Sequence, residues 1–141
     1  MAEEPAESLA AAVAREHRAL DELLGRFFGA AHAGALDAAR EAMREFDEEL
    51  RRHTAFEEER ILPAALPGAR KLLPGEQESD RDRLAREKRL EHVQIRELSG
   101  MMLGLLERGD PEGAVRLAAN LARRWDAHTA REEEALGRDR G

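Results

Sequence analysis

Residues 53–59 of the chain read His-Thr-Ala-Phe-Glu-Glu-Glu, and residues 128–134 read His-Thr-Ala-Arg-Glu-Glu-Glu, 75 positions further on. Each stretch places a glutamate four residues after a histidine, so on a helix the two side chains lie one turn apart on one face. Imidazole and carboxylate groups are ligands that divalent transition metals accept. The two stretches therefore predict a helical bundle that holds a two-metal site, with iron as the expected metal.

The composition is that of one all-α domain spanning residues 1–141. A chain of this length has the usual size of a single domain and can bury one sizeable core. It is rich in alanine, leucine, glutamate and arginine, which are strong helix formers, and it contains no tyrosine. Its prolines lie between long segments of helical periodicity, where they do not interrupt a helix.

The net charge and the missing residue types exclude several classes of function. A net charge of −7 disfavours a nucleic-acid-binding surface. The absence of cysteine excludes a thiolate nucleophile and iron–sulfur ligation. No apolar run approaches the roughly 18 residues that a membrane span needs, and the acidic start Met1-Ala2-Glu3-Glu4 lacks the basic residues of a signal peptide. We therefore expect a cytoplasmic protein whose partners include neither a membrane nor a nucleic acid.

Helical periodicity predicts four helices, at about residues 5–33, 35–62, 80–108 and 111–136. The first should begin near Pro5 or Ser8, and Gly137 should end the last. We expect Pro63 to end the second helix, because proline cannot continue a helix in its interior.

Polar residues mark the starts of the third and fourth helices. Ser79 is the expected N-cap of the third, with Asp82 completing a capping box, and Asp110 caps the fourth. Residues 63–79 form the longest connection, and its leucines indicate that it folds back on the bundle. A connection of this length is often functional, so we hypothesise that it covers the metal site.

Each predicted helix has an inward seam whose positions follow in steps of four and three residues. Every seam contains a histidine, and the second and fourth seams contain a glutamate one turn later. These seam residues are His17, His53, Glu57, His92, His128 and Glu132. A buried carboxylate costs several kcal/mol unless a nearby positive charge compensates it, so the two glutamates require a reason for their position.

An internal repeat brings these residues to one height. The repeat of 75 positions relates His17 to His92, His53 to His128, Glu57 to Glu132 and Glu16 to Glu91. In each hairpin one histidine stands 17 residues before the glycine of the short turn and the other stands 19 residues after it. Equal distances along paired helices give equal heights, so the four histidines should meet in one layer, about 25 Å from the short turns.

Three alternative arrangements fit these six residues less well than a two-metal site. In a metal-free polar network, protonated histidines would pair with Glu57 and Glu132. A ferritin-like site needs a glutamate three residues before a histidine. The four positions concerned hold Ala14, Leu50, Arg89 and Trp125. A zinc-protease motif needs two histidines four residues apart, a spacing that the chain lacks.

The order His17, His53-x-x-x-Glu57, His92, His128-x-x-x-Glu132 is more specific than either half alone. Around it stand the strings Glu16-His17-x-x-Leu20, His53-Thr54-Ala55-Phe56-Glu57 with Ile61-x-Pro63, and Glu91-His92-x-x-Ile95-Arg96. Over nearly its whole length the chain resembles the hemerythrin-like (HHE cation-binding) domain family. The resemblance implies an antiparallel up-down-up-down four-helix bundle with a non-haem di-iron centre.

The resemblance also implies a role for each residue of the pattern. Glu57 and Glu132 would bridge two iron ions, and the four histidines would complete the shell, two per iron; an oxo or hydroxo bridge stays open. Such centres bind dioxygen, nitric oxide or peroxide, so we expect a carrier, sensor or scavenger of dioxygen or a related small ligand. The alternatives are a di-iron enzyme that turns over peroxide or nitric oxide, and a non-redox iron-binding or iron-sensing module. The oligomeric state stays open.

Two positions depart from the oxygen-carrying hemerythrins. Lys88 stands where those proteins have a fifth histidine, and Glu133 stands where they have an aspartate. We prefer Glu132 to Glu133 as a ligand, on helical phase and on the symmetry of the repeat. Lys88 either extends into solvent or donates to a bound ligand, whereas Glu58 and Glu133 are solvated or fix an imidazole proton. Four histidines leave a more open site than five.

Overall fold

The computed structural model describes residues 8–138, with side chains described to residue 134, and its described residues form helices and no strand. The helices are α1 (Leu9–His32), α2 (Leu36–Phe56), the π-helix η1 (Glu57–Ile61), the short α3 (Leu62–Ala65), α4 (Asp80–Glu107) and α5 (Pro111–Arg138). The prediction of an all-helical bundle is confirmed. None of the described helices is long and apolar enough to cross a membrane.

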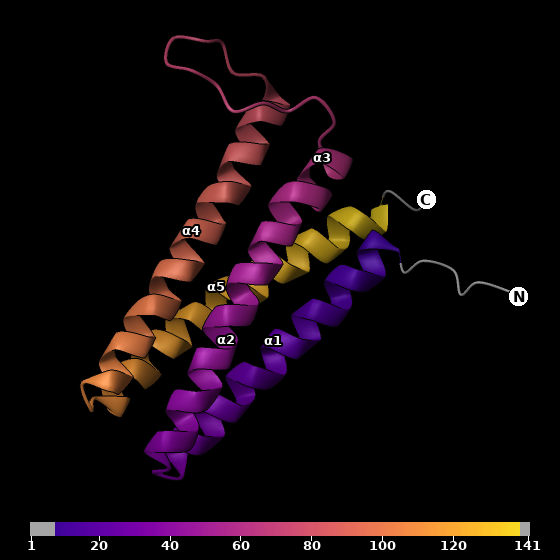
Figure 1. Cartoon of the computed structure of the whole chain (residues 1–141). Coiled ribbons are helices and arrows are strands. Elements are labelled where there is room, and N and C mark those ends of the chain that lie inside the picture. Colours follow the sequence, from indigo (N-terminus) through magenta and orange to yellow (C-terminus); the bar gives the residue numbers. More distant parts are fainter. Residues whose placement is uncertain (1–7, 139–141) are drawn as a thin grey trace, which may run out of the picture.

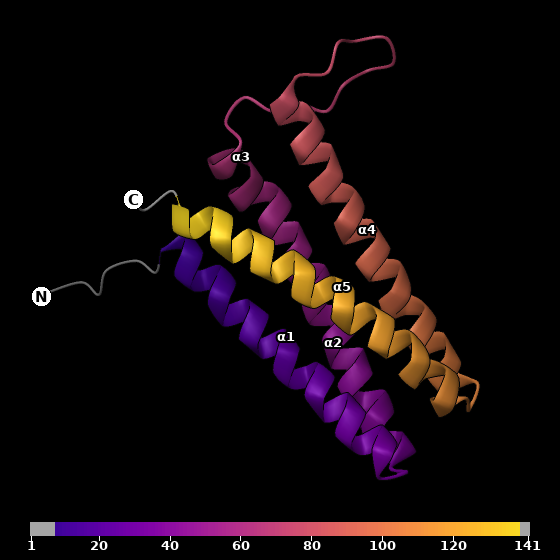
Figure 2. The same ribbon diagram turned by 180° about the vertical axis from the view of Figure 1, so that it is seen from behind.

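The four long helices form two hairpins that pack side by side (Figure 1). Short turns join α1 to α2 and α4 to α5 at one end of the bundle, and the long connection to α4 lies at the other end. Helices α1 and α4 each contact both α2 and α5. Figure 2 shows α5 lying along α1, so that the start of α1 and the end of α5 come together. Each histidine-bearing helix therefore borders the same interior space.

The two short turns have the same construction, as the repeat predicts. Gly34 and Gly109 both adopt a positive φ, 74° and 78°, which glycine tolerates without strain. Behind them, the Ala35 N–H donates to the Ala30 carbonyl and the Asp110 N–H donates to the Leu105 carbonyl, both at 2.9 Å. These are Schellman caps, which end each helix and reverse the chain. Both hairpins therefore close at equivalent residues, which sets the four histidines at comparable heights.

The predicted seams form the core. The inward positions that follow in steps of four and three residues are all buried from Ala39 to Glu57, along α2 and into η1, and from Ala114 to Glu132 along α5. Apolar side chains fill the interior between the short turns and the histidine layer, among them Leu20, Phe27, Phe46, Met102 and Trp125. Lys88 is an exception, because it is only half-buried on α4. The apolar part of the core thus ends where the histidines begin.

The predicted end of the second helix at Leu62 is wrong, because the helical path continues through Pro63 to Ala65. The π-helix η1 intervenes, and its last bond runs from the Leu62 N–H to the Glu57 carbonyl. Pro63 then occupies the first turn of α3, where a missing N–H costs no intrahelical hydrogen bond. The chain therefore does not leave the helix at the proline. It passes from α2 through one π-helical segment into the short α3, which contains Pro63.

The other boundaries lie close to the predicted ones. Ser8 caps α1 by accepting from the Ala11 N–H, whereas the alternative start at Pro5 lies outside the described residues. Ser79 and Asp82 form the predicted capping box, and Asp110 accepts from the Gly113 N–H. Helix α5 continues past the predicted end at 136 and through Gly137, since a single glycine costs a helix only about 1 kcal/mol. The sequence also predicts that the tail to Gly141 frays, but residues 139–141 lie outside the described residues.

Candidate metal centre

Six buried side chains from five helical segments converge at the loop end of the bundle. They are His17 of α1, His53 of α2, Glu57 of η1, His92 of α4, and His128 and Glu132 of α5, and each is at most 4% exposed. All six residues of the predicted pattern are therefore brought together. They form two groups whose ligand atoms lie within 4.8 Å of one another, His17, His53, Glu57 and Glu132, and His92, His128, Glu57 and Glu132.

The two glutamates belong to both groups and lie between them. We call His17 and His53 the first half of the cluster, and His92 and His128 the second half. Glu132 lies 3.0 Å from Nε2 of His17 and 3.3 Å from Nε2 of His128, through its two different oxygens. Glu57 similarly contacts His53 through Oε1 and lies 3.0 Å from Nε2 of His92 through Oε2. Each carboxylate thus presents one oxygen to each half.

The arrangement separates Glu132 from its neighbour Glu133. Glu132 is buried and faces both halves, whereas the Glu133 side chain is 50% exposed and lies outside the cluster. Its Oε1 is 3.1 Å from Nδ1 of His17, on the side of the ring away from Glu132. Of the two roles predicted for Glu133, a solvated side chain or a contact that fixes an imidazole proton, the structure therefore shows the contact, with His17.

Three further carboxylates lie behind the remaining imidazoles. Glu16 is 2.7 Å from Nδ1 of His53, and Glu91 is 3.4 Å from Nδ1 of His128. Glu58 faces Nδ1 of His92 at 3.9 Å, which is beyond hydrogen-bonding distance. Sequence reasoning missed this role for Glu16 and Glu91, although their place in the 75-residue repeat, next to His17 and His92, was a usable signal.

Trp125 forms the floor of the centre on its core side. Its ring lies edge-on to His17 and His53, with centroids 5.3 and 5.8 Å away, and tilted to His128 at 6.0 Å. The indole Nε1–H donates to Asp21 Oδ1 at 2.9 Å, which fixes the ring across the interface of α5 and α1. The imidazoles of the first half therefore pack against a rigid apolar wall. The seam of the fourth predicted helix indicates only a core position for Trp125.

Several polar atoms of the six cluster residues are buried without a hydrogen bond. Nε2 of His17, His53 and His128 and Oε1 of Glu57 and Glu132 are buried without a well-oriented hydrogen-bond partner. Nearly all buried polar atoms in folded proteins have such a partner. The five atoms named are lone-pair donors that face the interior of the cluster, whereas a sixth, Nδ1 of His92, faces outward towards Glu58. Imidazole nitrogen and carboxylate oxygen suit iron, manganese or zinc, so the residues fit a bound cation pair.

Without a cation, protons hold the cluster together. Burial lowers the pKa of His17 and His128, but the adjacent carboxylates of Glu132 and Glu57 outweigh it and raise these pKa values to about 10 and about 9. Burial acts in the same way on His53, and Glu57 again outweighs it and raises the pKa. Burial alone would raise the pKa of Glu57, but contacts with the four histidines lower it far below its usual range. Protonated imidazoles therefore supply the positive charge that a metal would otherwise supply.

The long connection covers this end of the bundle only in part. Leu66 and Ala69 are half-buried and line a cavity of about 220 Å³, with Glu58 in its wall. The Arg70 N–H donates to Asp82 Oδ1 at 2.8 Å, which ties the connection to the first turn of α4. Of the leucines that led us to expect the connection to fold back on the bundle, Leu66 and Leu72 are half-buried, whereas Leu73 is 71% exposed. Control of ligand access by this segment stays a prediction.

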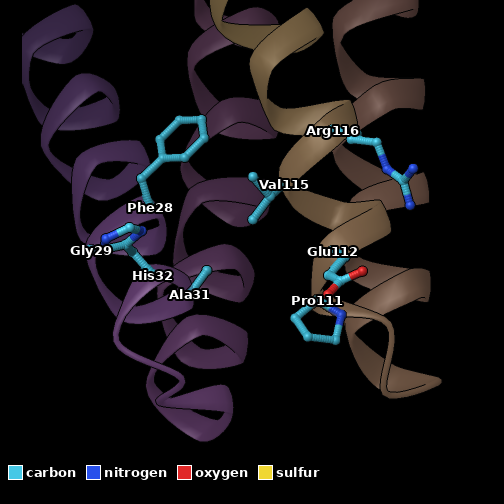
Figure 3. A pocket seen from close by; sticks show the side chains of 8 residues that line it. All are labelled: Phe28, Gly29, Ala31, His32, Pro111, Glu112, Val115 and Arg116. Atoms are coloured by element: carbon cyan, nitrogen blue, oxygen red, sulfur yellow. The ribbon is translucent and has the colours of Figure 1, made fainter.

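The cavity of about 820 Å³ drawn in Figure 3 lies away from the cluster, next to the short turns. Its lining comes from the end of α1 and the start of α5, and includes Phe28, His32, Val115 and Arg116. His32, the one histidine outside the cluster, is exposed there. This cavity therefore adds nothing to the metal centre.

Comparison with known proteins gives one match. The family model described as hemerythrin HHE cation binding domain matches residues 8–138. No curated protein and no solved structure matches the chain. The matched range contains all six residues of the cluster and both short turns.

Proposed function

The chain belongs to the hemerythrin HHE cation-binding domain family, and from this premise we propose that it is a non-haem di-iron protein that binds dioxygen or a related small ligand. The observation that carries the proposal is the pair of overlapping groups that share Glu57 and Glu132. Two cations placed between shared carboxylates neutralise charges that are otherwise costly to bury. We infer the antiparallel up-down-up-down order of the family for the same bundle.

In this proposal each half of the cluster holds one iron ion. His17 and His53 would hold one ion, His92 and His128 would hold the other, and Glu57 and Glu132 would be shared by both. Each ion then has two imidazole nitrogens and two carboxylate oxygens from the protein. Iron that prefers six ligands keeps open positions with such a set, as other non-haem iron sites do. The bound metal pair supplies the electrons and the Lewis acidity for binding a diatomic ligand.

The protein's own groups prepare the site for this chemistry. Trp125 and the apolar core exclude water from one side, which strengthens electrostatic interactions within the site. The outer carboxylates accept from Nδ1–H and so present Nε2 to the interior. Four histidines rather than five favour ready access of a small ligand to the open positions.

Optical titration tests the proposed function. The protein is loaded anaerobically with two ferrous ions per chain, exposed to oxygen and then purged with argon while the visible spectrum is followed. We expect a coloured species that disappears on purging and returns with oxygen. Irreversible oxidation that only a reductant reverses would instead support an enzyme acting on peroxide or nitric oxide. Failure to bind two ions per chain would contradict the central assignment.

Metal binding should release protons, because the metal-free cluster holds them. At pH 7.5, His17 and His128 are protonated with pKa values of about 10 and about 9, so we expect at least two protons to leave when two cations bind. Calorimetry of zinc binding in buffers of different ionisation enthalpy counts these protons. An observed enthalpy that does not depend on the buffer would contradict protonated imidazoles in the metal-free cluster.

The same groups set how the metal-free protein responds to pH. Because the folded-state pKa values lie above the unfolded value near 6.5, their stabilisation is complete below about pH 6.5 and is lost as the pH rises towards 9 to 10. We therefore expect the melting temperature of the metal-free protein to fall between pH 6.5 and 9.5. Thermal melts followed by circular dichroism measure this, and a rising melting temperature would contradict the pairing.

A further inference from the structure

We propose that the two halves of the cluster bind their cations with unequal affinity, and that the first half, His17 and His53, fills before the second half, His92 and His128. The inference rests on the proposed two-metal function. It concerns the carboxylates that face the outer nitrogens of the imidazoles. The internal repeat pairs each of these carboxylates in one half of the chain with an equivalent one in the other half.

The repeat places one carboxylate behind each imidazole. Glu16 and Glu91 are related by 75 positions and face His53 and His128, while Glu58 and Glu133 are related in the same way. Those two glutamates face His92 and His17 from outside. With respect to carboxylates alone, the two halves are equivalent. A carboxylate that accepts the outer N–H makes the inner imidazole nitrogen a stronger ligand.

The contacts to these carboxylates are shorter in the first half. The Nδ1 to oxygen distances are 2.7 Å for His53 and 3.1 Å for His17. In the second half they lengthen to 3.4 Å for His128 and 3.9 Å for His92. Both imidazoles of the first half thus have a hydrogen-bonded carboxylate, whereas His92 has none at bonding distance.

Arginines account for this difference. Arg131 forms a close ion pair with Glu91, and Nη1 of Arg96 lies 3.8 Å from Glu58 while donating to Thr54 Oγ1 at 3.1 Å. Both arginines therefore attract carboxylates that would otherwise face only the imidazoles of the second half. Among residues with described side chains, no arginine forms an ion pair with Glu16 or Glu133.

The sequence itself breaks the repeat at these two positions. The residue equivalent to Arg131 is Phe56, and the residue equivalent to Arg96 is Asp21. Asp21 adds a negative charge on the side of the first half, where it accepts from Trp125 Nε1. A symmetric set of ligands is thus surrounded by an asymmetric set of charges. The better-supported imidazoles favour the first half for a dication.

A zinc titration of the protein labelled with ¹⁵N in its histidines tests the order, because zinc is diamagnetic and each ring gives its own nuclear magnetic resonance signals. We expect the signals of His17 and His53 to change during the first equivalent and those of His92 and His128 during the second. Simultaneous change of all four rings, or earlier change of the second half, would overturn the inference. Failure of zinc to reach two equivalents would instead count against the proposed function, so the two failures are distinguishable.

Two variants test the cause. Removing both arginine charges in R96Q/R131Q should raise the zinc affinity of the second binding step by about tenfold. The difference between the affinities of the two steps should shrink accordingly. R83Q/R116Q is the matched control, since it removes the same charge from α4 and α5, and Arg83 pairs with Asp80 at the start of α4 while Arg116 lines the distant cavity. An unchanged ratio of the two affinities in R96Q/R131Q would refute the role of the arginines.

The reciprocal variant, F56R, introduces the missing arginine on the first half. It should lower the zinc affinity of the first binding step by a similar factor and leave that of the second step unchanged. If R96Q/R131Q folds poorly, F56R still tests the role of the arginines. The ring ¹⁵N shifts provide a readout that general destabilisation does not move, because they report the tautomer. In the zinc-loaded protein, His17, His53 and His128 should carry their proton on Nδ1, and protonation of one of these rings on Nε2 would contradict its positioning by an outer carboxylate.

Discussion

Replacing Glu57 with alanine is expected to remove bound cations from both positions of the cluster and to abolish the gain in melting temperature that metal provides. Glu57 is 1% exposed and presents one oxygen to each half, so its loss removes a ligand from both groups at once. A histidine substitution removes a ligand from one group only. We therefore expect Glu57→Ala to have a larger effect on metal content than His17→Ala.

The stability effect follows from mass action. A ligand present at 100 times its Kd stabilises the folded state by about 2.7 kcal/mol for each site, and the variant should lose this contribution from both sites. Metal analysis after dialysis and thermal melts with and without two equivalents of metal are the measurements. Without metal, the variant should also melt below the unmodified protein, because it loses the buried pairing of Glu57 with protonated imidazoles, so the metal-dependent gain is compared within each protein.

Glu59→Ala is the matched control, since Glu59 belongs to the same π-helix but is exposed. It should keep two cations per chain and the full metal-dependent rise in melting temperature. A second variant, Glu57→Gln, preserves the shape of the side chain and removes its charge, so it separates ligation from packing. If Glu57→Ala still retained two cations per chain, the bridging assignment would be wrong.

The cluster could be predicted from the sequence because two independent criteria select the same residues. Helical phase turns Glu57 and Glu132 inward, and the counts from Gly34 and Gly109 bring all four histidines to one height. The structure satisfies both criteria with helices of ordinary geometry up to Phe56. Where a site lies within regular helices, periodicity determines which side chains meet.

The features of the structure that could not be predicted from the sequence depend on irregular backbone geometry or on side chains that extend from one helix to another. The π-helix that starts at Glu57 has no distinct periodicity in the sequence, and it carries the helix past Pro63. Leu73 extends into solvent because the connection is tied down by backbone contacts near Arg70 rather than by its leucines. The outer role of Glu16 and Glu91 depends on side chains that cross between helices, which phase alone does not specify.

Replacing Trp125 with alanine is expected to destabilise the metal-free protein by about 3–5 kcal/mol, the usual cost of truncating a fully buried large aromatic side chain. The ring is in contact with core residues on one side and with His17 and His53 on the other, so its removal leaves a cavity directly beneath the first half. Since a domain of this size is stable by only about 5–15 kcal/mol, the expected loss is a large share of the total.

The conservative variant Trp125→Phe separates the two contributions of the ring. It keeps most of the buried aromatic surface and loses the Nε1–H bond to Asp21, which is exposed and can be hydrated instead. We therefore expect it to cost no more than about 1.5 kcal/mol, as a single hydrogen bond does. Urea unfolding followed by circular dichroism gives both values, because the variants lack the chain's one tryptophan as a fluorescent probe.

The two variants should also differ in metal binding. A cavity next to His17 and His53 lets these imidazoles move and admits water, so Trp125→Ala should weaken the first zinc-binding step more than the second. Trp125→Phe should leave the order of the steps intact, because the apolar wall remains. If Trp125→Ala weakened both steps equally, Trp125 would act through the stability of the whole bundle and not as the wall of the first half.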